Sequence, residues 1–539
     1  MGTSEKLVVV AVGLILWLSP GLIFSQSRLK MLPEGSYLIN MGIKPQTHTN
    51  ALKPYGLIYD LLQNRSMEVE WIIRPDKEKD EIDFTCDGIP YRSGAFAIPV
   101  SYISTEVAAQ IDRWEKKGVV GTYTTSALKL PVFSTLSVAP RWTLDKQNGH
   151  LAVPFFRAAG IPASAYGGDN SDKWKQPSEL GVCDDIFVMP HADPKFETHQ
   201  NLYYWNRDYK GAIWAGCRAV SILESLKGID QAGAGDSAQL IQLNFLSAGF
   251  PGAPSAGLLP YYEHRHGTPP YENLLPADPV AQYLGSPDKA QLNGSERVYF
   301  PKEINEWRDE TRLIVIDPDA PDIPEKSKGE AATIVYGYGF GDPDNGLVMY
   351  EAGHSIYGKG PDNIAAMRAF FNWSFYTTEL KRKKNLIKFR AVNADESIVA
   401  ARVGDDLSRV LDLRPIHFDL DKSEIRKKDA LALDDIADFM LKHPAILLDI
   451  RSHTDSRADD AYNLELSKKR VAATIAYLER KGIDVGRLSG RGYGETELLN
   501  DCRNGVPCSE TQHEKNRRSE FILSIDCKIF AELEEDSVE

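Results

Sequence analysis

Nearly continuous apolar segments alternate with helical ones along residues 27–375, and this alternation restricts the possible fold more than any other feature of the chain. Residues 67–74 and 346–352 are rich in β-branched, aromatic and other apolar side chains, a pattern typical of strands that are buried on both faces. Segments such as residues 105–118 carry apolar side chains at the spacing of one helix face. The alternation predicts an α/β domain over residues 26–378, with a covered and mostly parallel sheet.

A second and more compact pattern begins at residue 413. Predicted strands and helices alternate over residues 416–421, 423–444, 445–453, 462–482, 487–494 and 519–525. They predict a β-α-β-α-β-β domain over residues 413–527, which is long enough to fold independently. Residues 379–412 are expected to link the two domains, and the acidic residues 528–539 are expected to form a tail.

The first 25 residues have the order of an export signal. A charged start precedes the apolar run Leu7–Leu18, which is followed by the helix-breaking Pro20 and by a small residue at Ser25. The apolar run is too short to cross a bilayer. We predict a signal peptide over residues 1–25, with an uncleaved N-terminal anchor as the alternative. Since no later run is apolar enough to span a bilayer, we expect an exported protein without an integral membrane domain after cleavage.

The charge balance argues against nucleic acid as a partner. The formal net charge is −14 at neutral pH, whereas a phosphate-binding surface requires clustered Lys and Arg. The basic run Lys381–Lys384 stands alone, and we interpret it as a solvated boundary between domains.

Six cysteines in an exported chain favour disulfide formation. Cys502 and Cys508 enclose the turn-forming sequence RNGVP, so we predict that these two are bonded to each other. The other four have no comparable local partner, and both long-range pairing and unbonded thiols stay open for Cys86, Cys183, Cys217 and Cys527.

Polar and charged residues converge at the start of the second predicted helix of the C-terminal domain. Asn463, Ser467 and Arg470 have the spacing of one helix face, and Asp455 ends the preceding strand. A carboxylate and a guanidinium placed in this way can hold a zwitterion, with the acid at an ammonium and the arginine at a carboxylate. Spacing alone leaves an alternative, in which Asp455 and Arg470 pair with each other or with Lys468 and Glu465.

Four motifs of this region resemble the OmpA-like peptidoglycan-binding domain, namely FDLDKSEI, HTDSRADDAYNLELSKKRVAATIAYL, RLSGRGYGE and KNRRSEF. The resemblance implies that Asp455 and Arg470 bind the zwitterionic end of diaminopimelate in the peptide stem of the cell wall. It also implies supporting roles at the same site for Thr454, Asn463, Leu466 and Arg517. The cysteine-containing insert NDCRNGVPCSETQHEK departs from the family pattern and lengthens the loop beside the site.

One local pattern in the N-terminal domain has the form of a nucleophile elbow. A predicted strand leads through a tight turn at Cys217 into a predicted helix, and His354 follows a later strand. This chain order resembles class I glutamine amidotransferase-like domains over residues 136–376, which implies a flavodoxin-like α/β fold. Cys217 would then be the nucleophile, His354 its base and Glu351 an orienting acid. Ile356 stands where that family places its acid, which argues against activity.

The remaining histidines lack the spacing of metal ligands. Two loops carry them, and a joint site would draw on His191, Asp193, His199, His264 and His266. Because no pair follows a pattern such as HxxxH, we expect neither a metal site nor a cofactor.

The preferred interpretation is a non-enzymatic envelope protein of a double-membraned bacterium. Its C-terminal domain would bind peptidoglycan and tether the N-terminal α/β domain to the cell wall, in the periplasm at the outer membrane, where other envelope proteins are expected partners. Two alternatives stay open. One is an envelope cysteine hydrolase or amidotransferase-like enzyme that uses Cys217 and His354, with the C-terminal domain for targeting. The other is an adhesin or a component of a surface assembly.

Overall fold

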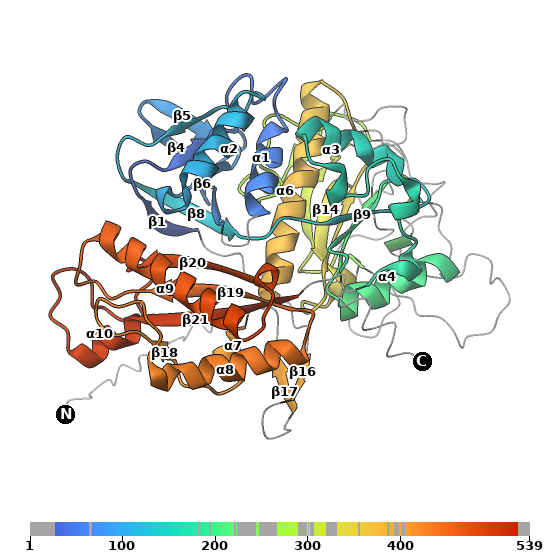
Figure 1. Cartoon of the computed structure of the whole chain (residues 1–539). Coiled ribbons are helices and arrows are strands. Elements are labelled where there is room, and N and C mark those ends of the chain that lie inside the picture. Colours follow the sequence, from blue (N-terminus) through green and yellow to red (C-terminus); the bar gives the residue numbers. More distant parts are fainter. Residues whose placement is uncertain are drawn as a thin grey trace, which may run out of the picture.

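The computed structural model of the protein describes residues 27–525 except for the segments 64–66, 182, 193–195, 220–221, 224–243, 247–266, 289–298, 300, 302–306, 320–330, 354–355, 385–388, 393–397 and 402–404. Outside the described residues lie the predicted signal peptide and tail, together with Asp193, His264, His266, His354 and Cys527. The described residues form sheets of six, seven and four strands and two sheets of two strands (Figure 1).

The first sheet has six strands and is antiparallel throughout. Its order is β1-β8-β3-β6-β2-β7, with β1 (Arg28–Leu32), β2 (Tyr37–Ile39), β3 (Val69–Ile72), β6 (Ala95–Ile98), β7 (Gly121–Tyr123) and β8 (Leu128–Leu136). The expectation of a mostly parallel sheet is therefore wrong for this part of the chain. One face packs on the helices α1 (Lys53–Leu62) and α2 (Thr105–Glu115), and the other on the hairpin of β4 (Ile82–Cys86) and β5 (Ile89–Arg92). Because both faces are covered, these antiparallel strands have the continuous apolar pattern of parallel ones.

The second sheet is mixed. Four neighbouring strands are parallel: β9 (Trp142–Leu144), β10 (Ile186–Met189), β11 (Ala212–Gly216) and β15 (Leu347–Glu351). Three antiparallel strands extend it: β14 (Ala332–Tyr338), β13 (Arg312–Ile316) and β12 (Glu272–Asn273). Helices α3 (Val153–Ala159) and α6 (Pro361–Lys384) pack on one face and α4 (Phe196–Asp208) on the other. The predicted parallel sheet is present in four strands, and the arrangement as a whole is a mixed α/β fold.

Helix α6 joins the two sheets into one core (Figure 1). Every residue from Asn363 to Glu379 is buried, so the helix is enclosed on all sides. The ring centroid of its Phe370 lies 5.2 Å from that of Trp214 in the second sheet. The ring centroid of its Tyr376 lies 5.8 Å from that of Phe133 in the first. The helix runs beyond residue 378 into the predicted linker. Neither α6 nor any other described helix is apolar enough over a sufficient length to cross a membrane.

The C-terminal domain is a four-stranded sheet with two long helices on one face. The sheet order is β18-β21-β19-β20, with β18 (Ile416–His417), β19 (Ile446–His453), β20 (Leu488–Gly494) and β21 (Arg518–Ile525). The helices α8 (Lys427–Lys442) and α9 (Asp460–Arg480) bury their apolar faces against it. The predicted β-α-β-α-β-β order is confirmed. Shorter elements accompany it: β16 (Phe389–Val392), β17 (Ile398–Ala401), α7 (Leu407–Val410) and α10 (Glu510–Asn516).

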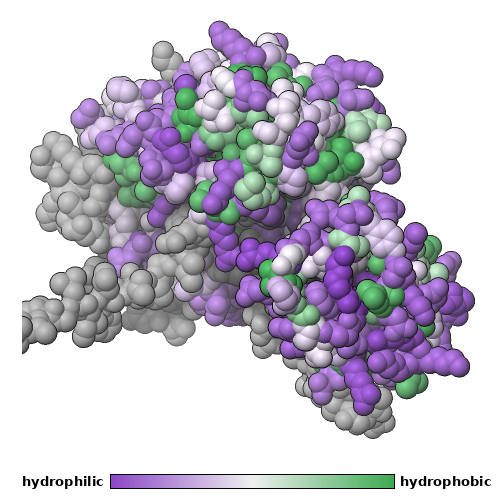
Figure 2. Space-filling view, turned by 90° about the vertical axis from the view of Figure 1, so that its left-hand side faces the viewer, coloured by the Kyte–Doolittle hydropathy of each residue, from purple (hydrophilic) through white to green (hydrophobic). Residues whose placement is uncertain are grey.

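The C-terminal domain meets the first sheet region through the edge strand β20. Arg491 Nη2 donates to the Ser101 carbonyl oxygen (3.0 Å), and its guanidinium lies over the Tyr102 ring. A cavity of about 280 Å³ beside this contact is lined by residues of both domains. Figure 2 shows a mainly hydrophilic surface on the C-terminal domain, at the lower right of that view.

Arg368 on α6 anchors the segment that precedes α1. Its guanidinium is buried and donates to the carbonyl oxygens of Met41 (2.9 Å), Gln46 (2.6 Å) and Ala51 (3.3 Å). Burial lowers the pKa of the Arg368 guanidinium, so these carbonyl oxygens have to compensate for the loss of water.

We predict that Arg368→Met lowers the free energy of unfolding of the N-terminal part by about 3 kcal/mol, because three buried carbonyl oxygens lose their donors. All tryptophans of the chain precede residue 374, so urea unfolding followed by tryptophan fluorescence reports on this part alone. Arg113→Met, at an exposed position of α2, is the matched control and should change the free energy by less than about 0.5 kcal/mol. Equal effects of the two substitutions would contradict the anchoring role.

Candidate functional site

The six residues selected by the OmpA-like resemblance lie around one pocket of the C-terminal domain. The pocket has a volume of about 580 Å³ and is bordered by the end of β19, the start of α9 and the loop after β18. Its lining includes Thr454, Asp455, Asn463, Leu466, Arg470 and Arg517. It also includes Asp421, Arg457 and Tyr462, which lie within the family motifs but to which the resemblance assigns no role.

The turn after β19 leads directly into α9, which supplies one wall of the pocket. Asp459 caps the helix, since its carboxylate accepts a hydrogen bond from the Tyr462 backbone N–H (2.9 Å). Gly492 on β20 allows α9 to pack closely against the sheet, because a Cβ there would lie 2.3 Å from Ser467 Oγ. The face of α9 that carries Arg470 is thereby held over the end of the sheet.

Asp455 is nearly buried and is held by two arginines. Its Oδ2 accepts hydrogen bonds from Arg457 Nη2 (2.6 Å) and Nε (3.1 Å), and from Arg517 Nη1 (2.7 Å). Burial acts to raise the pKa of the Asp455 carboxyl, but the hydrogen bonds from Arg457 and Arg517 outweigh it and hold this pKa below its usual value. The group is therefore a carboxylate at neutral pH, the form that binds an ammonium.

Glu510 completes a ring of four charged side chains that includes Asp455. Its Oε2 accepts from Arg457 Nη1 (2.8 Å) and its Oε1 from Arg517 Nη2 (2.7 Å). Acids and arginines thus alternate in the order Asp455, Arg457, Glu510 and Arg517. Glu510 is the first residue of α10 and lies in the cysteine-containing insert. The sequence SETQ, which opens that helix with a reciprocal capping box between Ser509 and Gln512, is the one sequence signal that marks its position.

Arg470 is completely buried, and its donors are directed at the backbone. Nε donates to the Lys422 carbonyl oxygen (2.9 Å), Nη1 to that of His453 (3.0 Å) and Nη2 to that of Asp419 (3.3 Å). Burial, and then the nearby Arg517, lower the pKa of Arg470 to about 10, while Asp455 acts in the opposite direction. The guanidinium is still charged at neutral pH. It fixes the loop after β18 to the end of β19 as well as lining the pocket.

Asp455 and Arg470 do not pair with each other by any hydrogen bond or ion pair among the described residues. Asp455 pairs with Arg457 and Arg517, while the nearby surface charges Lys468 and Glu465 pair together (2.7 Å). The alternative of a direct Asp455–Arg470 pair is therefore wrong.

Thr454 contributes a hydroxyl group that lacks a partner in the described part of the chain. Its Oγ1 is buried, and the residue lines the pocket beside Asp455. Buried hydroxyl groups rarely stay without a hydrogen bond, so this oxygen can bond to a water or to a polar ligand atom. Asn463 also lines the pocket, and its Nδ2 donates to the Ala458 carbonyl oxygen (3.2 Å) and to the Glu495 carboxylate. Leu466 adds an apolar side chain to the pocket lining.

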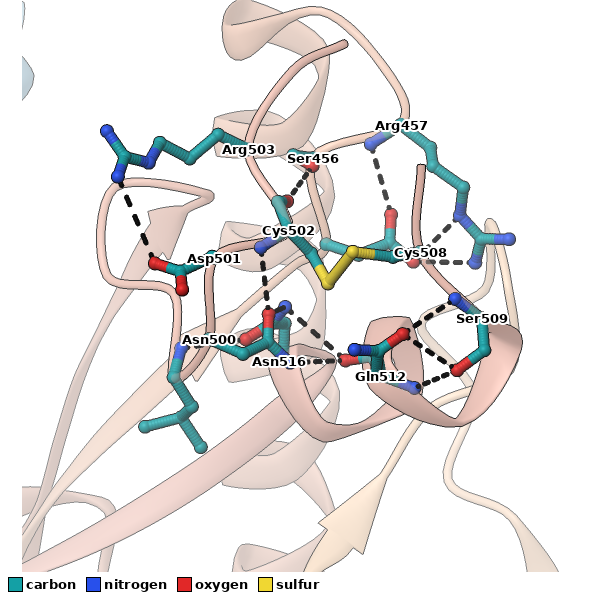
Figure 3. Close-up of a disulfide and its surroundings, with 12 residues drawn as sticks. Ser456, Arg457, Asn500, Asp501, Cys502, Arg503, Cys508, Ser509, Gln512 and Asn516 are labelled. Atoms are coloured by element: carbon teal, nitrogen blue, oxygen red, sulfur yellow. Dashed lines mark hydrogen bonds and ion pairs between the residues drawn. A yellow bond between two sulfur atoms is a disulfide. The ribbon is translucent and has the colours of Figure 1, made fainter. Parts of the chain in front are cut away.

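Cys502 and Cys508 form a disulfide beside the pocket (Figure 3). The Cys502 carbonyl oxygen accepts a hydrogen bond from Ser456 Oγ, in the turn that carries Asp455. Ser509, directly after the second cysteine, caps α10. The closed loop therefore connects the two segments from which the ring of charges is built.

We predict that replacing Cys502 and Cys508 by serine destabilises the turn after β19 and α10, by about 2 kcal/mol in the chain-entropy model for a loop this short. Hydrogen exchange of the full chain, read by mass spectrometry, should then be faster in residues 454–459 and 509–517. Cys86→Ser, in the other domain, is the control and should leave both segments unchanged. Unaltered exchange in the double variant would show that the disulfide does not support the pocket.

In the N-terminal domain, Cys217 follows β11 directly and has a backbone φ of 48°. A left-handed conformation is uncommon for a residue with a side chain and typical of a nucleophile elbow. Glu351 ends the neighbouring parallel strand β15, in register with Gly216. Cys217 and Glu351 thus lie at the carboxyl ends of two neighbouring parallel strands. His354 lies outside the described residues.

Glu351 is buried with incomplete hydrogen bonding. Its Oε2 accepts from Trp214 Nε1 (3.0 Å), and its Oε1 lacks a partner among the described residues. Burial raises the pKa of the Glu351 carboxyl to about 8, so this acid is largely protonated at neutral pH. No group of three or more His, Cys, Asp or Glu within the described ranges could hold a metal ion.

Comparisons with known proteins match the C-terminal domain. The family model described as OmpA family matches residues 417–512. The peptidoglycan-associated lipoprotein of Buchnera aphidicola subsp. Baizongia pistaciae is 30% identical over 150 residues, 28% of this chain and 79% of that protein. Outer membrane porin F of Pseudomonas aeruginosa is 36% identical over 87 residues, 16% of this chain and 25% of that protein. A match to the photosystem I P700 chlorophyll a apoprotein A2 of Gloeobacter violaceus, at 35% identity, spans 12% of that protein.

The matched solved structures likewise cover about a fifth of this chain. The peptidoglycan-associated lipoprotein from Burkholderia pseudomallei has 24% sequence identity and a TM-score of 0.20, and the match covers 21% of this chain and 92% of that chain. The C-terminal domain of Helicobacter pylori MotB has 23% identity and a TM-score of 0.20, with 23% and 93% covered.

Proposed function

The chain belongs to the OmpA family through its C-terminal domain, and from that premise we propose that this domain binds peptidoglycan non-covalently at the pocket around Asp455. The bound stem would present the zwitterionic end of diaminopimelate, with its ammonium at Asp455 and its carboxylate toward Arg470. The N-terminal domain would thereby be tethered to the cell wall. A wall ligand, together with the envelope names of the relatives, favours an exported protein in the periplasm at the outer membrane, where other envelope proteins are candidate partners.

One observation carries this proposal: six residues that are spread over 64 positions of the sequence, from Thr454 to Arg517, line one pocket. Within it, Asp455 offers a carboxylate of lowered pKa, Arg470 offers a permanent cation, and Thr454 offers a hydroxyl without a partner in the described chain. Opposite charges at fixed positions select a zwitterion over a simple anion or cation.

We predict that Asp455→Asn lowers the amount of protein retained on insoluble peptidoglycan by about tenfold or more, because a charge-assisted hydrogen bond to an ammonium is lost. Binding of the unaltered protein should persist at pH 5, since the pKa of Asp455 lies below its usual value. It should fall only at lower pH, where this carboxylate is protonated.

Arg470→Lys tests the second half of the clamp. Lysine keeps the charge but cannot donate to three carbonyl oxygens at once as the planar guanidinium does. Retention on peptidoglycan should therefore fall. Circular dichroism checks that the variant domain is folded. Arg503→Gln is the control, because this side chain is 78% exposed and lies outside the pocket. Undiminished binding by both the Asp455 and the Arg470 variants would overturn the proposed function.

The geometry at the sheet edge favours a second candidate function, thiol chemistry at Cys217. The left-handed backbone at Cys217 and the protonated, incompletely bonded Glu351 at the neighbouring strand end support it. A strained cysteine beside a neutral acid is suited to nucleophilic attack with proton donation. The C-terminal domain would then direct such an activity to the wall.

We predict that a small thiol reagent modifies Cys217 in the native protein faster than Cys86. Cys86 is the matched control, since it is also buried but lies in a regular strand, where burial and Asp87 raise the pKa of its thiol. Mass spectrometry of peptides after short exposure measures both rates, and Glu351→Gln should alter the rate at Cys217 alone. A Cys217 that reacts only after denaturation would remove this candidate.

A further inference from the structure

The two arginines that hold Asp455 are fixed to very different degrees. The Arg517 side chain is 5% exposed, and its Nε also donates to the Phe418 carbonyl oxygen (3.3 Å). The Arg457 side chain is 32% exposed, and the partners of its guanidinium among the described residues are two carboxylates, Asp455 and Glu510. Glu510 itself is 62% exposed. Arg517 is thus a built-in partner of Asp455, whereas Arg457 is an exchangeable one, since exposed ion pairs are weak.

Arg457 also occupies one of the two acceptor oxygens of Asp455. Asp455 Oδ2 already accepts three N–H groups, two from Arg457 and one from Arg517. A carboxylate oxygen has about two lone-pair sites, so there is no capacity for a fourth donor at this atom. Oδ1 accepts only one bond among the described residues, a long one from the Arg457 backbone N–H (3.3 Å). An ammonium can therefore bind Oδ1 directly, but to contact both oxygens of Asp455 it has to displace the Arg457 side chain from Oδ2.

We propose that Arg457 is an internal competitor that occupies the ammonium position of the clamp when no ligand is bound, and that it moves onto Glu510 when an ammonium enters. The inference rests on the proposed function and adds a specificity determinant to it. A lone amine replaces one cation by another and gains little. A zwitterionic ligand gains its carboxylate contact in addition, so the exchange favours zwitterions over simple amines.

Glu510 provides a carboxylate partner for the Arg457 side chain when it leaves Asp455. Arg457 Nη1 is already bonded to Glu510 Oε2 (2.8 Å) in the closed ring, so the displaced guanidinium keeps one carboxylate partner and does not enter solvent alone. Without Glu510, both arginines would have Asp455 as their shared acid, and the ammonium position would be more firmly occupied. The two exposed members of the ring therefore have opposite effects on ligand binding.

The test is isothermal titration calorimetry of the full chain with a soluble stem peptide that carries a free diaminopimelate end. Arg457→Gln should bind it about two- to fivefold more tightly than the unaltered protein, and Glu510→Gln about two- to fivefold more weakly, the range expected for removing one exposed ion pair. Arg503→Gln, an arginine in the disulfide loop that pairs with Asp501 at 3.9 Å, should bind as the unaltered protein does.

Each other outcome has a distinct meaning. Weaker binding by Arg457→Gln would show that Arg457 contacts the ligand or merely supports the loop, and would overturn the inference. Unchanged or tighter binding by Glu510→Gln would overturn it too. Asp455→Asn separates this inference from the proposed function: if that variant binds the peptide normally, the clamp itself is wrong, whereas loss of binding there leaves the Arg457 result decisive.

Discussion

A carboxylate removed from water has to be compensated by fixed positive charge, and this requirement organises the C-terminal domain around Asp455. Arg517 supplies compensation from the end of α10, and Arg457 supplies it from the turn that carries the acid. Arg470 is buried nearby and obtains its own compensation from the backbone carbonyl oxygens of two other segments. The groups that are placed to bind a ligand are thus the same groups that hold the surrounding loops together. Substitution of Arg470 therefore affects folding and binding together, and Asp455→Asn is the cleaner probe of recognition.

Two buried acids of the N-terminal domain respond to the loss of water in opposite ways. Asp185 is buried beside Arg141 (2.7 Å) and Lys381 (2.9 Å), and their charges hold its pKa below the usual value despite burial. Glu351 has no such cation and accepts a bond from Trp214, so burial raises its pKa to about 8. The first acid, Asp185, forms an ion pair with Lys381 that joins α6 to the sheet. The second is a neutral acid at the end of β15, in register with the residue before the left-handed Cys217.

The parts of this structure that the sequence predicts are those with a short-range signal. The two long helices and the four strands of the C-terminal sheet follow from hydrophobic periodicity, and the six pocket residues follow from motifs. Helix α10 was not predicted. The antiparallel first sheet could not be predicted in this way, because strands such as Val69–Ile72 are covered on both faces and read as parallel ones. Glu510 was out of reach for another reason: 53 positions separate it from Arg457, and only the folded insert brings the two charges together. The complete burial of Arg470 likewise depends on three carbonyl oxygens whose approach has no mark in the sequence.

The cysteine-containing insert makes the geometry of the pocket depend on one disulfide. It supplies Glu510 through α10 and holds the Asp455 turn through the bond from Ser456 to the Cys502 carbonyl oxygen. A disulfide persists in oxidising compartments and is reduced in the cytosol. The ring of Asp455, Arg457, Glu510 and Arg517 is therefore held more firmly when the Cys502–Cys508 disulfide is formed than when it is reduced. The insert that departs from the family pattern thus has a physical role of its own: it supplies the acid that balances the two arginines, and a covalent bond holds the loop that carries this acid.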